Sequence, residues 1–253
     1  MLQEIPIALE RDTIYECLLE LRFAPGHTSA EELLPGLLFG ALKPTFTSLT
    51  ALPLAQLPKG MRAADPQLAF QPVNALEGKY LRLMLGARVA TLSFTGQYLG
   101  WVNVLPTARR CVNAILETGH VGDVERCSLK YVNLLTDGEA QAGLDLLDLQ
   151  FRLNGFVPRG PGTLIRTELE VRGFRAIVEI MTDITITPPP DSGRQKASGV
   201  LVNVDVIHLG PFERFAHDLE ANLNALHEAE KTVFFNILKR STIERLGPTW
   251  REQ

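Results

Sequence analysis

The sequence predicts an α+β fold in which an antiparallel sheet, or sheets, carries its helices on one face. Several segments alternate apolar and polar residues with a period of two, which is typical of half-buried antiparallel strands. Other segments repeat apolar residues with a period near 3.6, as helices that pack on one face do. The same order of segments occurs twice in the 253 residues. We therefore expect two pseudo-repeated β-α-β-β-β-α halves, at 1–120 and 121–253, in one compact unit.

The first half begins with the clearest strand, at 14–23, where apolar and polar side chains alternate strictly. Ser29 and Glu32 have the spacing of a capping box, so a helix is expected after Ser29, and Pro44 ends it. A loop is expected at 47–66, because this stretch has three prolines and little periodicity. Three strands and a closing helix should follow, at 67–74, 79–86, 88–95 and 101–117.

The second half repeats this order, although its residue-level identity with the first half is too weak to show a duplication. Its strands are expected at 124–135, 163–172, 174–187 and 200–208. Its helices are expected at 139–153 and 211–240, the second being the longest of the chain. A polar loop rich in proline and glycine is expected at 188–199.

Composition narrows the class of protein. Hydrophobic residues make up 45% of the chain, and 25 basic against 29 acidic residues give a formal charge of −4. This balance disfavours a general nucleic-acid binder, which is usually strongly basic. The three cysteines are scattered, and no stretch resembles a signal peptide or a membrane span. We expect a cytoplasmic protein without membrane association.

A first candidate site is the polar face of the sheet, where strand parity places charges of both signs. This charged sheet face comprises Glu20, Arg22, Arg82, Lys130, Arg166, Glu168, Glu170, Arg172, Glu179 and Asp205. One interpretation is a solvated face with cross-strand ion pairs. The other uses Glu168, Glu170 and Arg172, whose spacing resembles the ExExK signature of the triphosphate-tunnel metalloenzymes. That resemblance implies a divalent metal beside a phosphate, although the cation is arginine here and the motif falls late in the chain. The sequence leaves the metal unassigned.

A second candidate site is a basic patch between Gly78 and Leu116, a stretch that contains no acidic residue. Its members are Lys79, Arg82, Arg88, Arg109 and Arg110. Such a patch can contact phosphate backbones or an acidic partner, and it is also what an ordinary protein surface shows.

No motif assigns a catalytic residue or a cofactor, and none is predicted. The chain lacks GxSxG, GxGxxG and P-loop sequences, and none of its histidines has the spacing of a helical zinc site. We interpret His227 as a surface or capping residue. Tyr98 and Trp101 are interpreted as a hydrophobic anchor.

Several short segments resemble an uncharacterised family of bacterial and archaeal proteins that is distributed sporadically among genomes. The matching residues are Pro6-Ile7, Leu19 to Phe23, Tyr98, Trp101, Leu129 to Asn133, Pro211-Phe212, Leu226-His227-Glu228, Phe234 and Gly247-Pro248. They span almost the whole chain, and Lys130 stands where the family pattern has arginine. The resemblance implies no activity or site residues, but it implies an accessory gene, such as one of a defence or toxin–antitoxin system.

The predicted function is a non-enzymatic protein-interaction module: a subunit, an adaptor or an antitoxin-like component that binds a protein partner. One alternative is a metal-dependent phosphohydrolase or nucleotide-binding protein that uses the charged sheet face. The other is a nucleic-acid-binding module that uses the basic patch. These alternatives remain open at the level of sequence.

Overall fold

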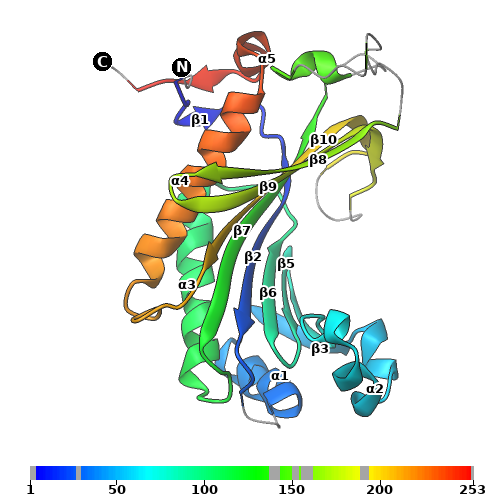
Figure 1. Ribbon diagram of the computed structural model, residues 1–253, viewed down its shortest axis with the longest axis vertical. Helices are drawn as coiled ribbons and strands as arrows, with labels where there is room; N and C mark the ends of the chain where they lie inside the picture. Colours follow the sequence, from blue (N-terminus) through cyan, green and yellow to red (C-terminus); the bar gives the residue numbers. More distant parts are fainter. Residues whose placement is uncertain are drawn as a thin grey trace.

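A nine-stranded antiparallel sheet forms the centre of the protein (Figure 1). The computed structural model describes residues 4–26, 30–136, 143–149, 154, 162–188 and 194–251. The strand order is β3-β4-β5-β6-β2-β7-β10-β9-β8, so the described sheet stays open and ends at β3 and β8. A separate two-stranded sheet pairs β1 (Ala8–Leu9) with β11 (Pro248–Thr249) and brings both ends of the chain together.

The bounds of the elements are as follows. The sheet strands are β2 (Ile14–Phe23), β3 (Phe46–Ala51), β4 (Asn74–Gly78), β5 (Leu81–Leu85), β6 (Val89–Phe94), β7 (Val124–Leu135), β8 (Leu164–Val171), β9 (Phe174–Ile186) and β10 (Ala197–Leu209). The α-helices are α1 (Ala30–Ala41), α2 (Lys59–Ala64), α3 (Trp101–Glu117), α4 (Leu219–Ile237) and α5 (Arg240–Arg245). Short 3-10 helices occur at Pro53–Gln56, Pro66–Leu68 and Leu144–Leu146.

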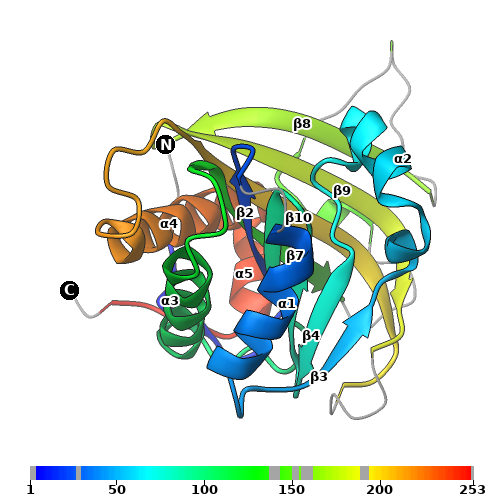
Figure 2. The ribbon, with the colours of Figure 1, turned by 90° about the horizontal axis from the view of Figure 1, so that it is seen from below.

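One face of the sheet forms the core, because its strands place apolar residues at every second position. In β2 these are Cys17, Leu19, Leu21 and Phe23, and in β10 they are Val200, Val202, Val204 and Val206. Helix α1 packs on β3 to β5, and α4 packs on β7, β9 and β10, with α3 against both helices. Figure 2 shows these three helices gathered against the curved sheet. The prediction of an antiparallel α+β fold is therefore confirmed.

Several predicted elements coincide with the structure. The strands expected at 14–23 and 124–135 and the helix expected at 101–117 have the bounds that their periodicity indicates. The hairpin of β8 and β9 also lies where the sequence places it. Each of these segments buries one complete face or stripe, so its apolar periodicity predicts its bounds.

The prediction for 47–74 is wrong. Helix α2 and all of strand β3 except Phe46 lie inside the expected loop. The strand expected at 67–74 does not form, since β4 begins at Asn74. Strand β3 is an edge strand in which Phe46 alone is buried, so it has no alternating pattern to detect. At 66–68 the Asp65 side chain accepts a hydrogen bond from the Gln67 amide (2.8 Å) and holds a 3-10 turn instead.

The helix predicted at 211–240 is too long at both ends. Helix α4 begins at Leu219 and ends at Ile237, and α5 is a separate short helix. Leu238 is extended and bridges to Leu147, while the Lys239 amide donates to the Leu146 carbonyl. The helix predicted at 139–153 lies partly outside the described residues, and the described stretch 143–149 holds a 3-10 turn.

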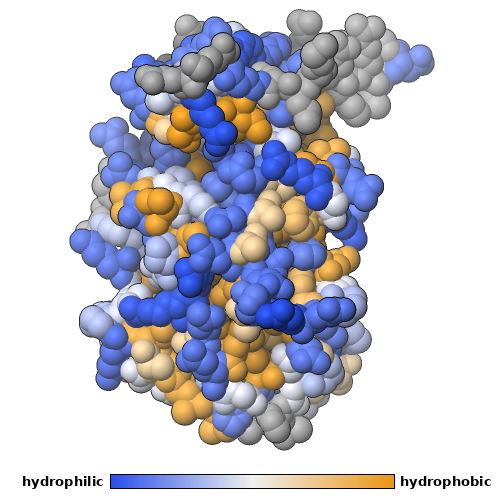
Figure 3. Space-filling view, turned by 90° about the vertical axis from the view of Figure 1, so that its left-hand side faces the viewer, coloured by the Kyte–Doolittle hydropathy of each residue, from blue (hydrophilic) through white to orange (hydrophobic). Residues whose placement is uncertain are grey.

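The ladder between β2 and β7 joins the two predicted halves at the centre of one sheet. Outward from β2 the order is β6, β5, β4 and β3, and outward from β7 it is β10, β9 and β8. The first half thus contributes one strand more to this sheet than predicted. The pseudo-repeat and the division at residue 120 stay predictions. Within the described residues, no helix is both long and apolar enough to cross a membrane. On the side of the molecule where α3 and α4 lie, apolar residues form separate patches among hydrophilic ones (Figure 3).

Candidate functional site

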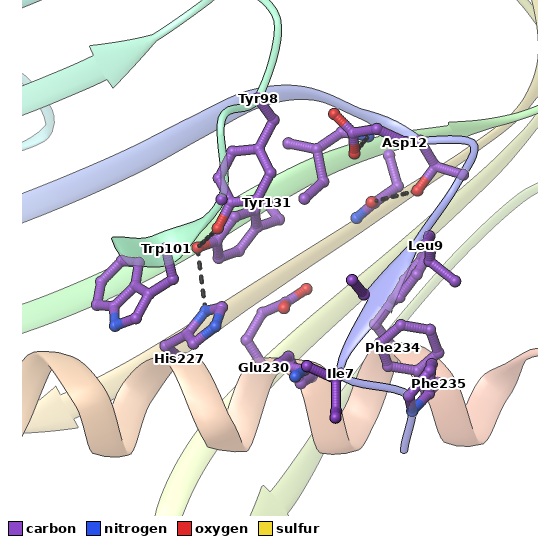
Figure 4. A pocket seen from close by; sticks show the side chains of 17 residues that line it. Ile7, Leu9, Asp12, Tyr98, Trp101, Tyr131, His227, Glu230, Phe234 and Phe235 are labelled. Atoms are coloured by element: carbon purple, nitrogen blue, oxygen red, sulfur yellow. Dashed lines mark hydrogen bonds between the residues drawn. The ribbon is translucent and has the colours of Figure 1, made fainter. Parts of the chain in front are cut away.

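A cavity of about 320 Å³ lies between the N-terminal segment, the start of α3, strand β7 and helix α4 (Figure 4). Much of its wall is apolar or aromatic, with Ile7, Leu9, Ile14, Trp101, Phe234 and Phe235. Polar groups also converge on it: Asp12, Thr13, Tyr98, Tyr131, Asn133, His227, Glu230 and Lys231. A concave apolar wall with a few placed polar groups is the usual form of a small-molecule site.

A chain of hydrogen bonds runs along one wall. The Tyr98 and Tyr131 hydroxyls lie 3.1 Å apart, and the Tyr131 hydroxyl is 3.1 Å from Nδ1 of His227. Tyr131 is 1% exposed, because it shares the helix-facing side of β7 with Cys127 and Leu129. Burial lowers the pKa of His227 to about 3, with a smaller effect of Lys231 in the same direction. The imidazole is therefore neutral near pH 7, and its Nδ1 can accept a hydrogen bond from the Tyr131 hydroxyl.

Trp101 fixes the position of the His227 ring. The two rings stack with their centroids 4.5 Å apart and an interplanar angle of 9°. The indole Nε1 of Trp101 donates to Oδ1 of Asn224 at 2.7 Å, one turn earlier on α4. The start of α3 and the middle of α4 are thus held together at the cavity.

Glu230 is the least expected residue of the site. It is 4% exposed, and its carboxyl group points into the cavity (Figure 4). No described residue donates a hydrogen bond or forms an ion pair with it. Burial raises the pKa of Glu230 to about 8, against a smaller opposing effect of Lys231. A buried carboxyl without a partner is costly, so it holds a proton near pH 7.

The N-terminal segment completes the wall with paired polar groups. The Asp12 carboxylate accepts from the Ile14 amide at 3.0 Å and from Arg194 at 3.4 Å. Its pKa is raised, since burial outweighs these hydrogen bonds and the Arg194 charge. Thr13 Oγ1 donates to Oδ1 of Asn133 at 2.8 Å. Asp12 and Thr13 thus have partners in the protein, in contrast to Glu230.

The charged sheet face lies elsewhere and divides into separate ion-paired groups. Near β2, Glu20 pairs with Arg22 (2.7 Å), and Arg126 pairs with Asp205 (3.1 Å) and Glu20 (3.8 Å). Arg126 is a central member of this face that the sequence analysis missed. In register, Lys130 faces Asp205. Burial raises the pKa of the Asp205 carboxyl, and the charges of Arg126 and Lys130 oppose this shift.

The outer part of this face is more exposed. Arg166 pairs with Glu179 (3.1 Å), and Glu168 pairs with Arg175 (2.6 Å). Glu170 faces Arg175 across the β8–β9 ladder. Arg172 departs from the prediction: it is in the β8–β9 turn with a φ of 51°, and it lines a second groove that adjoins the cavity. In the described part of the chain, no group of three or more His, Cys, Asp or Glu residues can hold a metal ion.

The basic patch is not brought together on one surface. Arg82, in β5, lies on the polar face and pairs with Glu77 at 2.7 Å, whereas α3, with Arg109 and Arg110, covers the opposite face. Arg88 pairs with Glu125 (2.8 Å), and Arg109 pairs with Glu220 (2.5 Å). The remaining members have other contacts: Arg110 donates to the Leu42 carbonyl, and Lys79 lies over the Tyr80 ring.

The comparisons with known proteins add no function to this site. No family model matches the chain, and a search of the curated proteins found no match. Membership of the sporadic family therefore stays a prediction. Many of the side chains that carry that resemblance nevertheless line the one cavity: Pro6, Ile7, Tyr98, Trp101, Tyr131, Asn133, His227 and Phe234.

The sequence alone does not assign these residues to a site. The expectation that His227 is a surface or capping residue is wrong, because the ring lies in the cavity wall beneath Trp101. The sequence does hold one signal for Glu230. Leu223 and Leu226 precede it and Val233 follows on the apolar stripe of α4, so an acidic residue occupies a buried helix position.

Proposed function

We propose that this protein binds a small organic molecule in the cavity between the N-terminal segment, α3, β7 and α4. The observation that carries this proposal is the unpartnered, buried carboxyl of Glu230 at an apolar cavity of about 320 Å³. A polar group left without a partner in such a place destabilises the fold, unless a ligand satisfies it. Unsatisfied polar groups of this kind are a reason to suspect a functional site.

The walls of the cavity are preorganised, which favours binding. Trp101 is fixed by a ring contact and a hydrogen bond, and Tyr131 is fixed by hydrogen bonds on both sides. A ligand therefore enters a site whose side chains have already lost their rotational freedom. Because burial raises the pKa of Tyr131 and lowers that of His227, these groups stay neutral near pH 7. They suit the positioning of a ligand rather than proton transfer to it.

Trp101 offers a direct test, since the chain has two tryptophans. In a Trp250→Phe variant Trp101 is the sole indole, and its emission reports on ligand entry beside His227. We expect saturable changes in emission with some members of a chemically diverse set of small molecules. Ala8→Phe in the same background places a ring at the cavity wall and should abolish them. If the emission does not respond to any compound, or if Ala8→Phe leaves the responses unchanged, the proposal is wrong.

A protein partner, the function predicted from the sequence, is a second candidate. The observation that favours it is the exposure of Leu99 (68%) and Val102 (80%), apolar residues on either side of Trp101. Purification of the tagged protein from its native host, beside a Val102→Glu variant, tests it. A companion that is lost in the variant supports binding at this surface. Binding at this surface is contradicted if the same proteins co-purify with the wild type and with Val102→Glu, or if no protein co-purifies with either.

A further inference from the structure

We propose that the ligand of the cavity is an organic cation, whose ammonium or amidinium group binds the Glu230 carboxylate while its apolar body fills the aromatic part of the cavity. This inference rests on the proposed function and adds the chemical class of the ligand. It follows from what Glu230 lacks and from what surrounds it.

Glu230 needs hydrogen-bond donors, and the protein does not supply them. An ionised carboxylate accepts through two oxygens and donates nothing. The nearby Tyr98 and Tyr131 hydroxyls are engaged with each other and with His227, and Trp101 donates to Asn224. A cationic nitrogen supplies the missing donors together with a positive charge in direct contact, which is the combination that makes a buried carboxylate tolerable.

The other acidic residue named in the wall shows the contrast. Asp12 accepts from a backbone amide and from Arg194, so its demand for donors and positive charge is met within the chain. Among the described residues Glu230 has no hydrogen-bond donor and no ion pair, and the nearby charge of Lys231 lowers its pKa less than burial raises it. A ligand cation therefore has one preferred anchor in the cavity, and that anchor lies on α4.

The rest of the wall suits an apolar body. Ile7, Leu9, Phe234 and the Tyr98 and Tyr131 rings line the same space. Aromatic rings near a cation contribute an additional attraction when water is excluded. A volume of 320 Å³ corresponds to roughly ten water-sized groups, so a ligand the size of a small aromatic amine fits.

Binding of a cation should release a proton from Glu230. The titratable groups of the cavity wall around Glu230 are Asp12 of the N-terminal segment, Tyr98 before α3, Tyr131 of β7, and His227 and Lys231 of α4; Cys17 of β2 also interacts with its charge. Burial raises the pKa of both tyrosines and of Cys17, and it lowers that of His227, so none of these four titrates near pH 7. Glu230 starts protonated, and a cation stabilises its carboxylate form. About one proton should therefore be released for each ligand bound near pH 7.

Matched pairs of amines and alcohols test the inference on the full-length protein. The amines are benzylamine, phenethylamine and tryptamine, and their neutral counterparts are benzyl alcohol, 2-phenylethanol and tryptophol, with phenylacetate as an anion. Calorimetry at neutral pH in phosphate and in Tris measures affinity and proton release together. We expect at least one amine to bind roughly 10- to 100-fold more tightly than its alcohol. Its apparent enthalpy should differ between the buffers as the release of a proton requires.

Two variants of α4 locate the effect. Glu230→Gln keeps the shape of the side chain and removes the negative charge, so the preference for the amine over the alcohol should disappear. Glu228→Gln makes the same chemical change two residues away at an exposed position, and it should bind like the wild type. The unfolding temperature of each variant shows that it is folded.

The outcomes separate this inference from the proposed function. If an alcohol or phenylacetate binds as tightly as the amines, or if Glu230→Gln keeps the amine preference, the ligand is not a cation held by Glu230. The cavity then still binds a ligand, and the proposed function stands. If no amine binds, the cation is ruled out. If the Trp101 titrations also find no ligand, the proposed function fails with it.

Discussion

At the scale of single residues, the burial of Glu230 has a consequence for stability that needs no ligand. Its pKa in the folded protein is about 8, above the ordinary value of 4.5, so the folded state binds more protons than the unfolded chain between these values. The contribution of Glu230 to the free energy of unfolding is therefore largest below pH 4.5 and is lost as the pH rises from 4.5 through 8. Above that range both states are ionised, and the whole cost of the buried charge is present.

Glu230→Gln should remove this loss of stability. Compared with the wild type, the variant is expected to gain roughly 4 kcal/mol in unfolding free energy between about pH 5 and about pH 9, at about 1.4 kcal/mol per pKa unit. Urea unfolding across this range measures the difference, with Glu228→Gln as the exposed control. A difference between Glu230→Gln and the wild type that does not change with pH would show that Glu230 is not protonated in the folded state.

Tyr131 provides a second residue-scale prediction, because its hydroxyl joins Tyr98 to His227. Tyr131→Phe leaves both partners buried without it, which should cost about 1–3 kcal/mol of unfolding free energy. The control is Tyr15→Phe, since the Tyr15 hydroxyl bonds to no described residue and its ring packs under Arg194. Equal unfolding free energies for the two variants would contradict the importance of the hydrogen-bond chain.

At the scale of strands and helices, the contribution of an ion pair to the free energy of unfolding depends on how far its element buries it. Arg126 of β7 pairs with Asp205 of β10 where both side chains are largely covered, at 16% and 20% exposure. Arg109 of α3 pairs with Glu220 of α4 in solvent, at 46% and 51% exposure. An unpaired charge is therefore penalised by desolvation at the Arg126–Asp205 pair but not at the Arg109–Glu220 pair.

Arg126→Met and Arg109→Met should therefore have unequal effects. Loss of Arg126 removes the ion-pair partner of the Asp205 carboxylate, between two central strands, at an expected cost of about 1–3 kcal/mol near pH 7. Loss of Arg109 should cost less than about 1 kcal/mol. Adding Asp205→Asn to Arg126→Met should recover part of the loss, and chemical denaturation of the three variants measures it. No recovery would mean that the two side chains are not coupled.

At the scale of the whole molecule, the two ends of the chain hold the wall of the cavity in place. The amides of Ile7, Glu10 and Arg11 donate to the carbonyls of Thr249, Gly247 and Leu246, at 2.8–3.0 Å. The N-terminal segment lines the cavity, so the C-terminal segment stabilises the site without lining it.

Removal of residues 247–253 should open this wall. We expect faster amide exchange at residues 7 and 10 and stronger acrylamide quenching of Trp101, with the rest of the sheet unaffected. Trp250→Phe in the full-length chain is the reference for the fluorescence, and removal of residues 252–253 alone is the control for shortening. Unchanged exchange and quenching in the truncated protein would show that the N-terminal segment holds its place without β11.

The strands and helices that pack a full face could be read from the sequence. Strand β2, helix α3 and strand β7 have their predicted bounds, because period-two and period-3.6 patterns arise directly from burial of one side. The edge strand β3 could not be read, since a strand with one buried residue carries no such pattern.

For the candidate site, too, part could be predicted from the sequence and part could not. The antiparallel α+β class and the elements that bury one full face follow from the sequence alone. Tyr98, Trp101, Tyr131 and His227 belong to the segments that resemble the sporadic family, but the sequence does not assign them to a site. That these residues meet is visible only in the tertiary structure, because 33 positions separate Tyr98 from Tyr131 and 96 separate Tyr131 from His227. The tertiary structure also decided that Glu230 is enclosed without a partner. A pattern along the chain records which side of an element is buried, whereas a pKa and a cavity depend on the distant segments that pack around a side chain.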